Sequence, residues 1–335
     1  MNAPLKTISF SQGINMALDE AMAADPNVFV LGEDVADEQG GGVFKATLGL
    51  SAKYGASRVR STPISEQAII GAAVGAAITG MRPVAEIMFM NFLTVCMDQI
   101  VNHAAKLRFM SGGLTSVPLT IRCGTGAGVG FGGQHSDMLE AWFAHVPGLK
   151  VLQPSTPHDA KGMLLAAIDD PNPVLIFEHK LLYKTKGHVP EEAYRVPIGQ
   201  AAIRREGADI TIVGSSIMAL KAQAAAERLA TEGISAEVID LRSIRPIDFS
   251  TIAESVRKTH RLLVVYEGVK TMGIGAEISA MIAESEVFDF LDAPIIRLGG
   301  ADVPIPYNPV LEKAAVPQED DIVTAAANLV RRGEA

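Results

Sequence analysis

The sequence predicts an α/β protein of two domains with mostly parallel sheets. The chain has 335 residues, which is long enough for two domains. Short runs rich in β-branched residues alternate with helix patterns, as in strands joined by helical crossovers. A polar stretch with Gly and Pro, residues 184–197, interrupts the alternation, which then restarts. We interpret this stretch as an interdomain linker.

In the first domain, apolar runs of three or four residues predict five buried strands, at residues 28–31, 84–87, 119–121, 150–152 and 174–177. Helix patterns occur between them, at residues 12–24, 68–80, 96–110, 137–145 and 158–169. This alternation predicts a mostly parallel sheet with helices on both faces.

The second domain is smaller and repeats the same alternation. Its predicted strands lie at residues 210–213, 237–240, 261–265 and 295–297. Its predicted helices lie at residues 219–231, 249–259, 274–282 and 318–331.

Composition excludes several classes of function. The net charge of −9 argues against nucleic acid as the main partner, and 5% aromatic residues are too few for a base-stacking surface. Cys96 and Cys123 form no metal-ligand pattern and suggest a reducing compartment. We find neither a secretory h-region nor a membrane-spanning run, so the sequence predicts a cytoplasmic protein.

Glu66 is the only ionisable residue between Arg60 and Arg82. It precedes a helix pattern of small apolar residues. A carboxylate buried there without a partner would have a raised pKa and could exchange protons near neutrality. The alternative is an ordinary acid in the first turn of a helix, with Ser65 as its N-cap.

Glycine is concentrated immediately before His135. Six glycines lie within residues 124–133, and we expect His135 to open the helix that follows. Such a loop lets backbone approach a ligand closely and can carry a side chain on a mobile hinge. It lacks the P-loop motif, and a flexible surface loop is the alternative interpretation.

Two further patterns have a functional and a structural interpretation. Gly273 and Gly275 resemble half of a dinucleotide fingerprint, but Ile278 occupies the position of the third glycine, which favours an ordinary helix N-terminus. Phe89 and Phe92 follow a predicted strand end, where open α/β sheets bind ligands, although packing in the core explains such aromatics equally well.

Six separated motifs, taken together, resemble a known family. They are LGEDV (31–35), TPISE (62–66), DQ (98–99), QHS (134–136), VPGLKV (146–151) and DLRSIRP (240–246). In this order and spacing they resemble the β subunit of the thiamine-diphosphate-dependent first component of 2-oxo acid dehydrogenase complexes. The resemblance covers nearly the whole chain. It implies a transketolase-like pyrimidine-binding domain at residues 1–187 and a transketolase C-terminal-like domain at residues 198–335.

Within this family, three segments are most similar to acetoin dehydrogenase β subunits. They are FEHKLLY (177–183), KG (186–187) and VPEE (189–192). Asp137 departs from the family, whose members usually have Gln after His-Ser. This departure adds a negative charge next to His135.

The resemblance implies roles for individual residues. Glu66 would hydrogen-bond the aminopyrimidine ring of thiamine diphosphate and favour the imino tautomer that activates the thiazolium ring. Phe92 would stack on the pyrimidine, Ile64 would contact it through its backbone, and Glu33 would belong to the same cofactor-binding set. His135 would face the substrate and move protons during acyl transfer to a lipoyl arm.

The resemblance also implies that the cofactor site is shared. The family binds the diphosphate through Mg²⁺ with a Gly-Asp-Gly segment, and this chain contains none. An α subunit would therefore supply that half of the site, in an α₂β₂ heterotetramer. Relatives also bind a structural K⁺ through backbone and side-chain oxygens, which would map to Leu119, Ala167, Ile168, Asp170 and Asn172.

The leading hypothesis is therefore an enzyme subunit. It would cleave acetoin, or decarboxylate pyruvate or a branched-chain 2-oxo acid, and pass the acyl group to a lipoyl-bearing acyltransferase. A non-catalytic chain that only scaffolds the α subunit is the second hypothesis. A nicotinamide-dependent oxidoreductase is the third, disfavoured by the incomplete glycine pattern.

Overall fold

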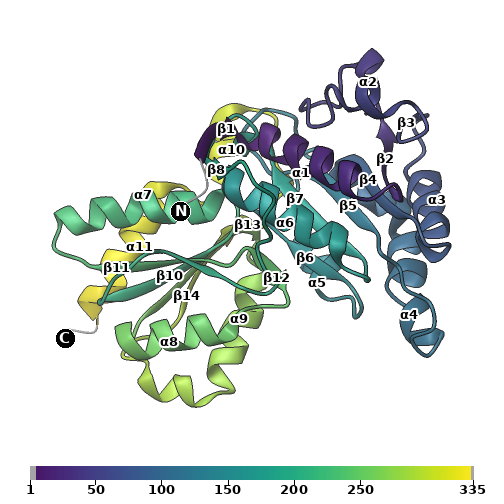
Figure 1. Cartoon of the computed structure of the whole chain (residues 1–335). Coiled ribbons are helices and arrows are strands. Elements are labelled where there is room, and N and C mark those ends of the chain that lie inside the picture. The colour runs from purple at the N-terminus through teal and green to yellow at the C-terminus, as the bar shows by residue number, and fades with distance from the viewer. Residues whose placement is uncertain (1–4, 333–335) are drawn as a thin grey trace. The chain divides into compact units, whose positions relative to one another are not determined.

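The computed structural model describes residues 5–332, in two units (Figure 1). The first unit contains residues 5–125 and 142–198, and the second contains residues 126–141 and 199–332. The glycine-rich segment and His135 therefore group with the second unit.

A parallel sheet forms the centre of the first unit. Its strand order is β6-β7-β5-β4-β2-β3, and each neighbouring pair is parallel, as predicted. The strands are β2 (Val28–Glu33), β3 (Val59–Thr62), β4 (Arg82–Phe89), β5 (Thr120–Thr125), β6 (Lys150–Leu152) and β7 (Val174–His179).

Three main helices accompany this sheet: α1 (Phe10–Ala24), α3 (Glu66–Ile78) and α6 (Pro157–Asp169). Ser9 starts α1 with a reciprocal capping box, in which its Oγ accepts from Gln12 N at 3.2 Å and its N donates to Gln12 Oε1 at 2.8 Å. Shorter elements are α2 (Leu50–Tyr54), α4 (Leu107–Met110), α5 (Glu140–Ala144) and the 3-10 helices η1 (Asp37–Gln39) and η4 (Lys180–Leu182).

An antiparallel ribbon completes the first unit. Strand β1 (Leu5–Ser9) pairs with β8 (Lys186–Pro190). Strand β8 therefore occupies part of the stretch that was interpreted as a linker. The polar residues there are compatible with a strand because the ribbon is largely exposed.

The second unit contains a five-stranded sheet of order β14-β13-β10-β11-β9, parallel except for the edge strand β9. Helices α7 and α11 pack together on one face, and α8 and α9 lie on the other (Figure 1). The strands of this sheet are β9 (Ala202–Arg205), β10 (Ile210–Gly214), β11 (Ala236–Asp240), β13 (Leu262–Val269) and β14 (Ile296–Gly300). A further short strand, β12 (Ser243–Arg245), is not part of it. The helices are α7 (Ile217–Thr231), α8 (Phe249–Thr259), α9 (Ile274–Ala283), η5 (Glu286–Phe290), α10 (Pro309–Ala315) and α11 (Glu319–Arg332).

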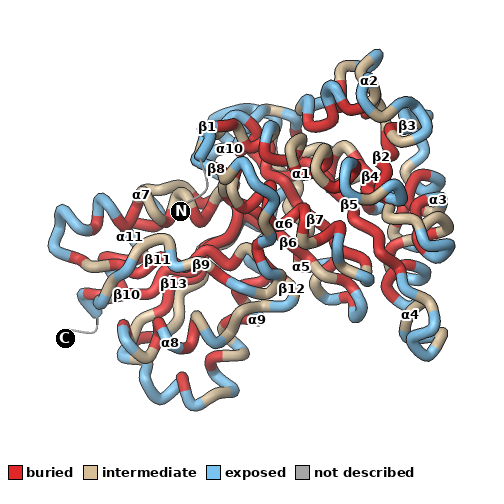
Figure 2. Tube along the Cα trace, in the orientation of Figure 1, coloured by how far each residue is buried: buried red, intermediate tan, exposed pale blue. Residues whose placement is uncertain are grey.

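Burial follows the two sheets. Figure 2 shows buried residues along the central strands and a mixture of buried and exposed residues along the helices. In the second unit, apolar side chains of α7 and α11 form one cluster with β10, β11 and β13. Within residues 5–332, no helix is long and apolar enough to cross a lipid bilayer.

Two predicted helices of the first unit were wrong in detail. Residues 96–110 do not form one α-helix: they contain the end of a 3-10 helix, η2 (Met90–Cys96), a π-helical segment, η3 (Gln99–Ala104), and α4. The helix predicted at residues 137–145 is only the five residues of α5. His135 therefore lies five residues before the helix that it was expected to open.

Candidate active site

Glu66 is the first residue of α3. Ser65 occupies the N-cap position, but its side chain makes no capping hydrogen bond, so that part of the structural alternative was wrong. Glu66 is partly exposed rather than buried, whereas Ile69 and Ile70 in the next turn are buried. Its carboxylate is therefore accessible to a ligand at an apolar helix start.

The charge of Glu66 affects the pKa values of two neighbouring residues, Glu33 and Cys96. Glu33 ends β2, and partial burial, Asp34 and Glu66 together raise the pKa of its carboxyl. Burial and the charge of Glu66 raise the pKa of the Cys96 thiol to about 12. The Cys96 thiol consequently stays protonated, and the two glutamates form an acidic pair at the carboxyl end of β2.

Phe92 and Ile64 are the apolar residues predicted for this site. Phe92 lies in η2, which packs against α3, and its ring meets buried Phe89 edge-on at 5.7 Å between centroids. Ile64 is 75% exposed, which is unusual for an apolar side chain two residues before the helix. The first unit therefore presents Glu66 together with apolar surface that residues 5–332 leave uncovered.

His135 follows a segment whose glycines have left-handed backbone. The φ angles are 90° at Gly126, 106° at Gly128, 71° at Gly130 and 72° at Gly132, conformations that other residues rarely adopt. His135 N donates to Gly132 O at 3.2 Å, and the ring of Phe131 meets the imidazole edge-on at 6.4 Å. The segment is therefore an ordered series of turns that ends at His135.

Two buried acids of the same unit accept hydrogen bonds from backbone N–H groups of this loop. Glu267 accepts from Ala127 N at 2.6 Å, and Glu312 accepts from Gly128 N at 2.7 Å and from Gly130 N at 3.1 Å. Burial, together with the charge of Glu267, raises the pKa of Glu140 to about 8. Glu140 is thus a buried acid that changes charge near neutrality.

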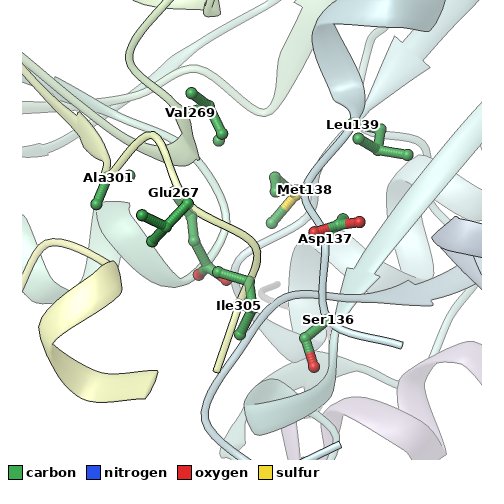
Figure 3. A pocket seen from close by; sticks show the side chains of 11 residues that line it. Ser136, Asp137, Met138, Leu139, Glu267, Val269, Ala301 and Ile305 are labelled. Atoms are coloured by element: carbon green, nitrogen blue, oxygen red, sulfur yellow. The ribbon is translucent and has the colours of Figure 1, made fainter. Parts of the chain in front are cut away.

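A cavity of about 40 Å³ lies next to this loop, enough for at least one water molecule. Figure 3 shows Ser136–Leu139 on one side of it and Glu267, Val269 and Ala301 on the other. The cavity lies between the residues that follow His135 and the carboxyl ends of β13 and β14.

Sequence reasoning missed Glu140, Glu267 and Glu312. Glu267 lies 140 residues beyond Ala127, and Glu312 lies 184 beyond Gly128, so no local pattern joins them. The one usable signal is Glu267 itself, which lies two residues after the strand predicted at residues 261–265 and directly before Gly268.

The residues predicted for K⁺ are brought together around β5, the end of α6 and the start of β7. Their backbone oxygens already accept hydrogen bonds: Leu119 O from Val174 N, Ala167 O from Asp170 N, and Ile168 O from Arg82 Nη1. A carbonyl oxygen has a second lone pair, so each of these oxygens can accept one more contact.

The side-chain oxygens of the same set are also engaged. Asp170 pairs with Lys150 and accepts from Asn172 N, and Asn172 Oδ1 accepts from Arg108 Nη1 at 2.9 Å. Each of the five residues predicted for K⁺ therefore already has an oxygen in a hydrogen bond or ion pair.

Packing explains why positions 273 and 275 are glycine, without the dinucleotide interpretation. Gly273 caps α9, and a Cβ at either glycine would lie 2.4 Å from the ring of Tyr266. Both positions are glycine because the Tyr266 ring packs against the start of this helix.

Family models match both halves of the chain. Residues 6–186 match the transketolase pyrimidine-binding domain, and residues 199–322 match the transketolase C-terminal domain. The chain is thus built from domains of the transketolase class.

Curated relatives narrow this class. The chain is 51% identical over 329 residues to the mitochondrial pyruvate dehydrogenase E1 component subunit beta-2 of Oryza sativa subsp. japonica, covering 97% of this chain and 87% of the relative. It is 45% identical to the acetoin:2,6-dichlorophenolindophenol oxidoreductase subunit beta of Cupriavidus necator, covering 98% and 99%. The chain belongs to the family of β subunits of thiamine-diphosphate-dependent 2-oxo acid and acetoin dehydrogenases, which confirms the resemblance seen in the sequence.

Solved structures share this architecture. A split-gene transketolase described as an inactive beta4 tetramer has a TM-score of 0.81 at 25% identity, covering 97% of this chain and 99% of that chain. A transketolase from Leishmania mexicana has a TM-score of 0.71 at 16% identity, with 47% of its length covered, and shows likeness of fold alone.

Proposed function

We propose that this chain, together with an α subunit, cleaves acetoin or decarboxylates a 2-oxo acid and passes the acyl group to a lipoyl-bearing partner. The observation that carries the proposal is the placement of Glu66. Its partly exposed carboxylate starts an apolar helix next to exposed Ile64, in a chain with relatives among thiamine-diphosphate enzymes.

The residues of the first unit fit the pyrimidine half of the cofactor. A flat aminopyrimidine needs a hydrogen-bonding carboxylate and apolar surface, and Glu66, Phe92 and Ile64 offer both. Glu33 adds a second carboxyl beside Glu66. Thiamine diphosphate, when bound, supplies the electron sink at the acyl carbon. Glu66 would orient the ring and keep a proton at it, and Phe92 would exclude water from one face.

His135 would act on the substrate side. An imidazole can give and take protons near neutral pH, as transfer of an acyl group to a thiol requires. The ordered glycine turns before His135 support this role because they fix where the imidazole lies.

The α subunit would supply the Mg²⁺-dependent diphosphate site, since the chain lacks Gly-Asp-Gly. Small residues of α3, Ala68 and Ala72, are exposed in this chain, as a helix face awaiting a partner would be. We propose an α₂β₂ tetramer with cofactor at α/β contacts. The isolated chain should then bind thiamine diphosphate weakly in calorimetry, and tight Mg²⁺-dependent binding by it would contradict a shared site.

Three further assignments are also proposals. The domains would span residues 1–187 and 198–335, and the compartment would be the cytoplasm. K⁺ would bind the carbonyls of Leu119, Ala167, Ile168 and their neighbours Asp170 and Asn172. Thermal unfolding in KCl against NaCl would test that site, because only a bound ion raises the midpoint selectively.

The substrate can be assigned by assay of the α/β pair. Acetoin, pyruvate and 3-methyl-2-oxobutanoate should be compared by reduction of 2,6-dichlorophenolindophenol, the acceptor in the name of the Cupriavidus relative. Acetoin is supported by the segments at residues 177–192, and pyruvate by the 51% identity to the rice subunit. Turnover that persists in both Glu66→Gln and His135→Ala would favour the scaffold hypothesis.

A further inference from the structure

A buried carboxylate, that of Glu312, accepts hydrogen bonds from the glycine loop that precedes His135. Glu312 lies in α10 and is 3% exposed. One of its oxygens accepts from Gly128 N at 2.7 Å, and the other accepts from Gly130 N at 3.1 Å. Both oxygens are therefore used to fix two points of one loop.

The backbone of the loop is shaped for this contact. Gly128 and Gly130 both have left-handed φ angles, and such turns direct nearby N–H groups into a concavity that binds an anion. Here the anion is the side chain of Glu312. A residue with a Cβ at either glycine would be strained in this conformation, so the glycines and Glu312 form a matched set.

The remainder of the loop rests on the segment that precedes α10. A Cβ at Gly132 would lie 3.6 Å from the ring of Tyr307, and one at Gly133 would lie 3.6 Å from Ile305 O. His135 N donates to Gly132 O, so the backbone of His135 is hydrogen-bonded to the part of the loop that lies next to this segment. Residues about 170 positions further along the chain therefore lie next to the part of the loop that leads to His135.

We propose that Glu312 is a positioning residue for His135, acting through the hydrogen bonds to Gly128 N and Gly130 N that fix the loop of residues 126–135. The inference rests on the function proposed for His135 in acyl transfer. Glu312 itself touches neither substrate nor cofactor in this role. Its contribution is to keep the imidazole where the lipoyl thiol must arrive, since small misplacements of a catalytic group lower the rate strongly.

The test uses the assembled α/β complex with Glu312→Ala and, if that variant fails to fold, Glu312→Asp. Hydrogen–deuterium exchange of peptides spanning residues 126–139 should become about tenfold faster, because two hydrogen bonds to a buried carboxylate are lost. Acetylation of a lipoyl domain should fall on the order of 10–100-fold relative to dichlorophenolindophenol reduction. The same selective loss is expected for His135→Ala.

Glu237→Gln is the matched control. Glu237 is a buried acid of the same unit that accepts from a glycine, Gly207 N at 3.2 Å, but it does not contact the His135 loop. This variant should leave the exchange of residues 126–139 and the ratio of the two activities unchanged. A general loss of packing in the second unit would instead affect both variants alike.

A double variant, Glu312→Ala with His135→Ala, should be no worse in lipoyl acetylation than His135→Ala alone, since both act on one step. Unchanged exchange in Glu312→Ala would overturn the proposal whatever the activity does. Faster exchange with an unaltered activity ratio would also overturn it, provided that His135→Ala lowers that ratio. If His135→Ala leaves the ratio unaltered, the function proposed for His135 fails and the positioning role fails with it, while the exchange result still reports on the loop contact.

Discussion

The two units differ in the groups that contact their buried acids. In the first, Glu86 and Glu178 lie on neighbouring sides of Arg122, with N–O distances of 2.8 and 2.7 Å, and Tyr183 donates to Glu178 at 2.6 Å. In the second, Glu267 and Glu312 accept from backbone N–H groups of a glycine loop. Glu140 Oε2 is buried without a hydrogen-bond partner among the described residues.

The pKa directions express this difference. Burial opposes the charge of Arg122, but the nearby Glu178 and Glu86 outweigh it and raise the pKa of the guanidinium, which stays charged. Burial raises the pKa of Glu140 to about 8 and nearby Glu267 adds to the effect. Burial also raises the pKa of Glu86, although the charge of Arg122 opposes that shift. The units therefore differ in whether a cation opposes the effect of burial on a carboxyl.

Glu66 sharpens the comparison because its partner is expected to be the cofactor. Glu66→Gln keeps the size of the side chain but removes the carboxylate, so kcat of the α/β pair should fall on the order of 10²–10⁴. Proton–deuteron exchange at the thiazolium carbon of bound cofactor, followed by NMR, should slow to a similar extent. The fold should be unaffected.

Glu277→Gln is a matched control for that substitution. Glu277 is an exposed first-turn acid of α9, a helix that is also apolar and rich in small residues. Removing this carboxylate should change neither kcat nor the rate of proton–deuteron exchange at the thiazolium carbon. Equal rates for Glu66→Gln and the unaltered protein would show that Glu66 is only the first-turn acid of its helix.

Arg122 tests the structural half of the comparison. Arg122→Met leaves two buried carboxylates without their cation and should lower the free energy of unfolding by about 3–5 kcal/mol. Adding Glu86→Gln and Glu178→Gln to this variant should restore much of the loss, because no unpaired charge then remains. Urea denaturation followed by circular dichroism would measure both. A loss below about 1 kcal/mol for Arg122→Met alone would mean that the group is solvated or dispensable.

Elements with a long periodic pattern could be predicted from the sequence. Helices α7 and α11 differ from their predicted bounds by one or two residues, because each has a continuous apolar face against its sheet. Strand β9 and helix α10 were missed because four and seven residues give too little pattern. Residues 96–110 were predicted as one helix because their composition is helical, but the backbone changes there from 3-10 to π geometry.

The candidate site was predictable only where local composition was unusual. Glu66 and His135 stand out because one is a lone charge and the other follows six glycines. The acids that meet the glycine loop come from β13 and α10, and nothing in their neighbourhood indicates the contact. Pairings of this kind are set by tertiary structure, so they require coordinates.

Glu140 gives the smallest of the three effects and the most specific one. Below pH 4.5 the carboxyl is protonated in both the folded and the unfolded chain, and it contributes nothing to the pH dependence of stability. Between pH 4.5 and about 8 the unfolded chain releases this proton while the folded chain keeps it, so rising pH destabilises the fold. Above pH 8 the penalty is constant. At 1.36 kcal/mol per pKa unit, the shift from 4.5 to about 8 corresponds to a penalty of about 5 kcal/mol at most.

Glu140→Gln mimics the protonated acid at every pH. We therefore expect little change in the free energy of unfolding at pH 5 and a gain of about 2–4 kcal/mol at pH 9, measured by urea denaturation at both values. Glu277→Gln, which removes an exposed acid, should show no such pH-dependent gain. If Glu140→Gln keeps the pH slope of the unaltered protein, the carboxyl is already ionised in the folded state. The second unit would then stabilise its buried acids as completely as Arg122 stabilises those of the first.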